Sequence, residues 1–155
     1  YLKFLPEGQE LRGFSLSHSH GAVLCALRDG HSPEFGVDLE WIEPRPDSFQ
    51  QDFFTDRELA AVSLQPLALR PLAATLIWSA KEAVLKALRI GLGLDTLQIE
   101  VALPDRLEEK PGQWSLLSAS NPQEQRWQVG WQVRAGFVLT LAQPDPSPFH
   151  WQEIV

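Results

Sequence analysis

The chain contains no methionine and only one cysteine, Cys25, among its 155 residues. A single cysteine cannot form an internal disulfide, and the apolar residues around Cys25 predict a buried, unreactive thiol. We therefore expect a protein of a reducing compartment, the cytoplasm. Because the sequence does not begin with methionine, we also expect a processed chain or a piece of a longer polypeptide.

Cationic residues are in the minority. Lys and Arg number 13 against 20 Asp and Glu, which gives a net charge of −7. An acidic chain has no long-range attraction for polyanions, so nucleic acid and anionic membranes are not expected partners. No apolar run approaches the roughly 18 residues of a membrane-spanning helix, and the N-terminal residues lack a signal-peptide pattern. These absences predict a soluble protein, and its length predicts a single domain.

Short apolar and alternating runs predict a set of β-strands. A polar turn at residues 18–21 separates the first two strands, and a proline-containing break follows the third. The expected strands cover residues 11–19, 22–28, 35–42, 96–103, 113–118, 126–134, 136–142 and 151–155.

Two helices are predicted between the third and fourth strands. Thr55, followed three residues later by Glu58, matches a capping box that opens a short helix. Apolar residues at three- and four-residue steps predict a long amphipathic helix from about Leu69 to Arg89, with a left-handed cap at Gly91. Strands combined with one dominant helix place the chain in the α+β class.

Three carboxylates stand out by their positions. Asp38 and Glu40 lie two apart in a predicted strand and so share a face, which alternation alone would assign to solvent. Glu82 precedes Lys86 by four residues, a spacing that alone predicts an ordinary helical ion pair. Taken together, however, three hard oxygen ligands with lysines nearby suit a Mg²⁺ ion that carries a pyrophosphate.

Four segments follow one another in a specific order: SHS at 17–19, GVDLE at 36–40, FFTDRE at 53–58 and WSAKEAVLK at 78–86. In order and approximate spacing they resemble the 4′-phosphopantetheinyl transferase superfamily. The SHS element and the Trp-Ser-x-Lys-Glu form resemble the surfactin-synthetase-activating type. Helix periodicity dictates none of the polar identities in the last segment, so these identities favour a functional interpretation.

The resemblance implies a role for each matching side chain. Glu82 and Lys86 would be catalytic, with Lys86 also addressing the phosphates of coenzyme A. The remaining implied roles are metal ligation by Asp38, Glu40 and Glu82, and coenzyme binding by His18, Lys81 and Lys86. His18 would contact the 3′-phosphate end. Either Glu82 or a metal-bound water would take the proton of the attacking serine.

By resemblance, the expected reaction moves the 4′-phosphopantetheine group of coenzyme A to a serine of an acyl or peptidyl carrier protein. The reaction depends on Mg²⁺ and releases adenosine 3′,5′-bisphosphate. The implied fold is an antiparallel sheet packed on one long helix, in a family type built from two similar halves. Because SHS arrives at residue 17, we expect residues 1–34 to be a remnant of the first half and 35–155 to form the second. A homodimer could then supply the missing half.

Two other classes of protein remain open. A non-catalytic module of the same fold would bind carrier protein or coenzyme A without transferring the group. A different Mg²⁺-dependent phosphohydrolase would also use three carboxylates, although it needs a nucleophile or a second set of metal ligands that the sequence does not offer. Release of free phosphate would identify the phosphohydrolase.

Overall fold

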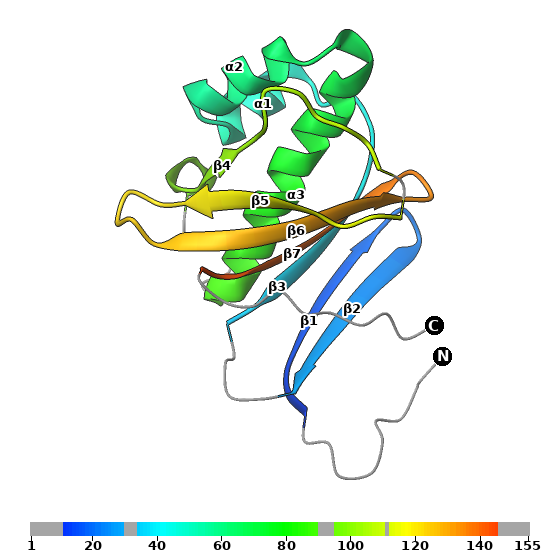
Figure 1. The fold of residues 1–155 in the computed structure, drawn as a ribbon, viewed down its shortest axis with the longest axis vertical. Helices are drawn as coiled ribbons and strands as arrows, with labels where there is room; N and C mark the ends of the chain where they lie inside the picture. Colours follow the sequence, from blue (N-terminus) through cyan, green and yellow to red (C-terminus); the bar gives the residue numbers. More distant parts are fainter. Residues whose placement is uncertain (1–10, 30–33, 90–94, 111, 146–155) are drawn as a thin grey trace.

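The computed structural model describes residues 11–29, 34–89, 95–110 and 112–145. An antiparallel five-stranded sheet, in the order β3-β7-β6-β5-β4, packs against the long helix α3, while β1 and β2 form a separate hairpin beside β3 (Figure 1). This arrangement confirms the α+β class. The relation between two similar halves stays a prediction.

The strands follow the expected pattern with local shifts. The hairpin joins β1 (Leu11–Ser19) to β2 (Ala22–Asp29). The strands of the main sheet are β3 (Gly36–Trp41), β4 (Glu100–Ala102), β5 (Ser115–Ser120), β6 (Arg126–Arg134) and β7 (Phe137–Pro144). The fourth expected strand is shorter than predicted because the 3₁₀ turn η3 (Thr96–Gln98) precedes it, capped by the Asp95 side chain. The expected strand at 151–155 lies outside the described residues.

The short helices lie together near the N-terminal end of α3 (Figure 1). Helix α1 (Asp47–Phe53) was not predicted, because the prolines before it suggest only a break; Pro46 in fact occupies its N-cap position. Helix α2 (Asp56–Leu64) begins with the predicted capping box: the backbone amide of Thr55 donates to Glu58 Oε2 at 2.8 Å, and the amide of Glu58 donates to Thr55 Oγ1 at 3.3 Å.

Helix α3 (Arg70–Leu88) follows the 3₁₀ turn η1 (Leu67–Leu69) and carries a proline in its first turn. Its left-handed cap is Arg89, with φ of 55°, rather than the predicted Gly91, which lies outside the described residues. No helix in the described segments is long and apolar enough to cross a membrane.

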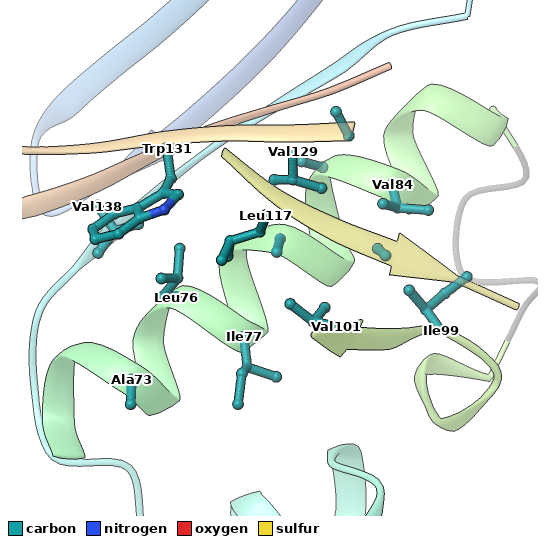
Figure 2. Close-up of a cluster of buried hydrophobic side chains, with 14 of the residues drawn as sticks. Ala73, Leu76, Ile77, Val84, Ile99, Val101, Leu117, Val129, Trp131 and Val138 are labelled. Atoms are coloured by element: carbon teal, nitrogen blue, oxygen red, sulfur yellow. The ribbon is translucent and has the colours of Figure 1, made fainter. Parts of the chain in front are cut away.

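The core forms where one face of α3 meets the sheet (Figure 2). Small and branched side chains of the helix interleave with side chains of the strands, and burial of this apolar surface is the main force that holds the layers together. The labelled members of the cluster are Ala73, Leu76, Ile77, Val84, Ile99, Val101, Leu117, Val129, Trp131 and Val138.

Helix α3 approaches β3 unusually closely at Gly36. A Cβ on Gly36 would overlap the carbonyl oxygen of Ala83 and lie 2.6 Å from the backbone nitrogen of Ala87. Only glycine permits this backbone contact. Because side chains alternate along a strand, the face of β3 that includes Gly36 also turns Asp38 and Glu40 toward the helix.

The β1–β2 hairpin has two unlike faces. Ser15 and Ser17 are buried against β3, and Ser15 Oγ accepts a hydrogen bond of 2.9 Å from the backbone amide of Val37. The opposite face is exposed and mainly apolar, and it carries Phe14, Leu16, Val23 and Leu27 together with Cys25. The prediction of a buried Cys25 is therefore wrong, because the apolar run around it lies in a strand with only one covered face.

We predict that Gly36→Ala lowers the free energy of unfolding by about 3 kcal/mol, the upper end of the usual overpacking cost, because a backbone atom cannot move aside. The matched control is Gly13→Ala, whose Cβ would meet only the side-chain ring of Phe35, with the nearest carbon at 3.1 Å. Urea unfolding followed by circular dichroism measures both. Equal stability of the two variants would contradict the close contact between β3 and α3.

Candidate active site

Asp38 lies buried between α3 and the hairpin, with 3% of its surface exposed. Its Oδ1 accepts hydrogen bonds from Lys86 Nζ at 2.7 Å and from Ser17 Oγ at 2.8 Å. Within the described segments, its buried Oδ2 has no hydrogen-bond partner. The burial argues against a solvent-facing carboxylate, and the bare oxygen leaves one strong acceptor position open.

Glu40 follows on the same face of β3, and both of its oxygens are engaged. Trp78 Nε1 donates to Oε1 at 3.2 Å, and Arg45 Nη2 donates to Oε2 at 2.7 Å. The two donors approach from different elements, since Trp78 belongs to α3 and Arg45 precedes α1. The sequence left open whether Trp78 lines the site or only packs at the helix–sheet junction. It gave no indication of Arg45, whose spacing from Glu40 carries no periodic signal.

Glu82 reaches the same region from α3. Burial raises the pKa of its carboxyl, and the negative charges of Asp38 and Glu40 raise it further, while the Lys86 ammonium opposes the shift. Asp38 and Glu40 therefore both lie within electrostatic range of Glu82. Two negative charges beside Glu82 make its own charge costly unless a cation joins them.

Lys86 lines a shallow, open hollow of about 570 Å³ between the hairpin and the C-terminal end of α3. Its side chain is 30% exposed although its ammonium contacts Asp38. The hollow is lined by Gly13, Phe14, Cys25, Leu27, Phe35, Lys86 and Arg89. Two cationic residues, Lys86 and Arg89, line this hollow, so it offers a place where anionic groups could be held.

The family model of the 4′-phosphopantetheinyl transferase superfamily matches residues 34–142. The chain belongs to this superfamily. It is also similar to the 4′-phosphopantetheinyl transferase HetI of Nostoc sp. strain PCC 7120, with 37% identity over 111 residues, 67% of this chain and 45% of the relative. The chain thus matches less than half the length of this curated relative.

The carboxylates of this transferase-family chain fit a divalent cation in their chemistry. Hard carboxylate oxygens are the ligands that Mg²⁺ prefers. In the described segments, the buried Asp38 Oδ2 has no hydrogen-bond partner. A cation would also offset the repulsion that Asp38 and Glu40 exert on a charged Glu82. In the described part of the chain no three acidic, histidine or cysteine side chains are already gathered as metal ligands. Arg45 and Trp78 each donate one hydrogen bond to Glu40, one to each carboxylate oxygen.

Lys81 lies apart from the carboxylates, although it adjoins Glu82 in the sequence. Its side chain is fully buried, and Nζ contacts Glu58 Oε2 at 2.7 Å, Phe53 O at 2.8 Å and Thr96 O at 2.9 Å. Burial lowers the pKa of Lys81 and raises that of Glu58, and each charge opposes the other's shift. All three ammonium protons have acceptors, so this position does not support the expected contact with coenzyme phosphates.

His18 is exposed on β1, on the hairpin face opposite to Ser17. The structure therefore places Lys86 in contact with Asp38, and Glu82 close enough to Asp38 and Glu40 to be influenced by both charges. His18 does not lie on the Ser17 face but on the hairpin face of Phe14, Cys25 and Leu27, which also line the hollow of Lys86. The residue that contacts Asp38 from this motif is Ser17, which sequence reasoning did not single out. The available signal was the alternation of side chains along the strand, which puts Ser17 and His18 on opposite faces.

We predict that Lys81→Ala lowers the free energy of unfolding by about 3–5 kcal/mol, because it leaves the Glu58 carboxylate buried without its cation. The control is Lys110→Ala, since Lys110 is 53% exposed and pairs with Glu108 at 3.4 Å. Thermal and urea unfolding measure the difference. If the Lys81→Ala protein is as stable as the unaltered chain but binds coenzyme A more weakly, this prediction is wrong and Lys81 binds the coenzyme.

Proposed function

We propose that this chain transfers the 4′-phosphopantetheine group of coenzyme A to a serine of an apo carrier protein, with Mg²⁺ as cofactor. The observation that carries the proposal is the buried Asp38, which has one oxygen paired with Lys86 and the other without a partner in the described segments. Glu40 and Glu82 lie within electrostatic range of it. Membership of the superfamily supports the same activity.

In this proposal Asp38, Glu40 and Glu82 hold the cation. When bound, Mg²⁺ would supply positive charge to the oxygens of the pyrophosphate and orient them. Lys86 extends from the same site into the open hollow and binds the pyrophosphate as a point charge. Its contact with Asp38 keeps the ammonium in place before the coenzyme arrives.

The bond changes follow from the substrates. The carrier-protein serine oxygen forms a bond to the β-phosphorus, and the bond from that phosphorus to the bridging oxygen breaks, which releases adenosine 3′,5′-bisphosphate. Lys86 stabilises negative charge that develops on the phosphate oxygens. Among the residues of this chain, Glu82 is the carboxylate that we assign to receive the serine proton.

Two finer assignments belong to the proposal. We place the chain with the surfactin-synthetase-activating type, supported by the SHS segment at 17–19 and the Trp-Ser-x-Lys-Glu form at 78–82. We also propose a homodimer in which a second copy contacts the exposed apolar residues of the hairpin that lie outside the hollow of Lys86, Leu16 and Val23. Light scattering of the purified chain across concentrations tests the dimer.

The deciding experiment measures the masses of several apo carrier proteins before and after incubation with the chain, Mg²⁺ and coenzyme A. A mass increase equal to one phosphopantetheine group, abolished by EDTA, supports the proposal. Binding of coenzyme A without any mass change would favour the non-catalytic module of the same fold. Omission of each component in turn provides the controls.

We predict that Glu82→Gln abolishes transfer and does not lower the free energy of unfolding. Gln keeps the side-chain volume and helix propensity of Glu82 but removes its negative charge. Burial and the neighbouring carboxylates raise the pKa of the Glu82 carboxyl, so loss of that charge should not weaken folding. The matched control is Glu108→Gln, a carboxylate that is 69% exposed and should tolerate the change. Transfer is measured across a Mg²⁺ titration, and a folded Glu82→Gln protein with normal turnover would disprove the metal assignment.

We predict that His18→Ala raises the KM for coenzyme A more than the KM for 3′-dephospho-coenzyme A. An exposed imidazole that serves the 3′-phosphate has nothing to bind once that group is missing. The stability should change little, because the side chain is exposed. Equal losses for both substrates would assign His18 to the hairpin surface alone.

A further inference from the structure

Arg45 is unusual among the cationic side chains because it is largely buried at the edge of the carboxylate site. Its side chain is 13% exposed, and its Nη2 contacts Glu40 Oε2 at 2.7 Å. Within the described segments, its buried Nε has no hydrogen-bond partner. A second, longer ion pair joins its Nη1 to Oε1 of the more exposed Glu43 at 3.8 Å. The shorter contact with Glu40 and the packing around Arg45 are therefore the main interactions that hold it in place.

Several contacts fix this guanidinium in place. Its Cζ lies over the ring of Phe49, 5.3 Å from the ring centroid, within the range of a cation–π contact. The side chain of Gln50 donates to the backbone oxygen of Arg45 at 2.9 Å, which ties the residue to α1. Phe49 in turn contacts the ring of Trp78, with 4.9 Å between centroids.

The two donors of Glu40 therefore belong to one packed unit. Phe49 touches both the Arg45 guanidinium and the Trp78 indole, and these two groups hold opposite oxygens of the carboxylate. Glu40 is held from two sides, so it has little freedom to rotate. A ligating carboxylate can keep such outer hydrogen bonds because each oxygen has a second lone pair for a metal.

We propose that Arg45 is a positioning residue that orients Glu40 as a ligand for the divalent cation. The inference rests on the proposed function, because it assumes that Asp38, Glu40 and Glu82 hold Mg²⁺. The planar guanidinium suits the task, since it can stack on Phe49 and donate to Glu40 at the same time. A lysine would keep the charge but lose the flat stacking geometry.

The opposing effect is electrostatic. Removal of a positive charge beside three carboxylates would by itself favour a cation, so simple competition and positioning forecast opposite changes in Mg²⁺ affinity. Loss of an outer hydrogen-bond partner of a metal ligand usually costs about 10–100-fold in affinity. The sign of the change in one variant therefore separates the two roles.

The test measures Mg²⁺ binding to the full chain by isothermal titration calorimetry, for the unaltered protein, Arg45→Met and Arg45→Lys. Arg45→Met is expected to weaken Mg²⁺ binding about 10–100-fold. Arg45→Lys should fall between that variant and the unaltered chain. Coenzyme A binding in EDTA should stay the same for all three proteins, which a general loss of structure would not allow.

The control is Arg57→Ala, because Arg57 also pairs with a glutamate, Glu100 at 3.0 Å, but is 84% exposed. It should bind Mg²⁺ as the unaltered chain does. Unchanged or tighter Mg²⁺ binding by Arg45→Met would overturn the positioning role. If Arg45→Met does not fold, unchanged Mg²⁺ binding by Arg45→Lys would overturn it instead. Absence of Mg²⁺ binding by the unaltered chain would overturn the proposed function first, and this inference with it.

Discussion

The candidate site depends on the close contact between β3 and α3 at Gly36. Since no side chain separates the two backbones there, the next residues on the same strand face meet the helix directly. Asp38 then reaches Lys86, and Glu40 reaches Trp78, which lie about two turns apart on the same helix. A bulkier residue at Gly36 would push the helix away and lengthen every one of these contacts.

Two lysines of one helical segment serve different purposes because of helix geometry. Five residues separate Lys81 from Lys86, which rotates their side chains by about 140° around the axis. Lys81 enters a buried network with Glu58 that ties α2 to α3, whereas Lys86 faces the hairpin and stays partly open to solvent. One ammonium has all its protons satisfied, and the other can still meet a substrate anion.

Local features could be predicted from the sequence, and features that depend on distant packing could not. The Thr55 capping box and the shared face of Asp38 and Glu40 follow from spacings of two or three residues, and both are present. Helix α1 escaped prediction because its neighbouring prolines favour a break. The buried state of Lys81 depends on Glu58, which lies 23 residues away in the chain, so no local pattern could indicate it.

The orientation of Asp38 is also coupled to the hairpin. A two-stranded hairpin alone is marginally stable in water, and this one gains support from β3 through Ser15 and Ser17. Its other face leaves Phe14 and Val23 exposed. Covering that face would steady the strand that carries Ser17, and with it the hydrogen bond to Asp38. The geometry of Asp38 is therefore coupled to the position of the hairpin through the Ser17 hydrogen bond.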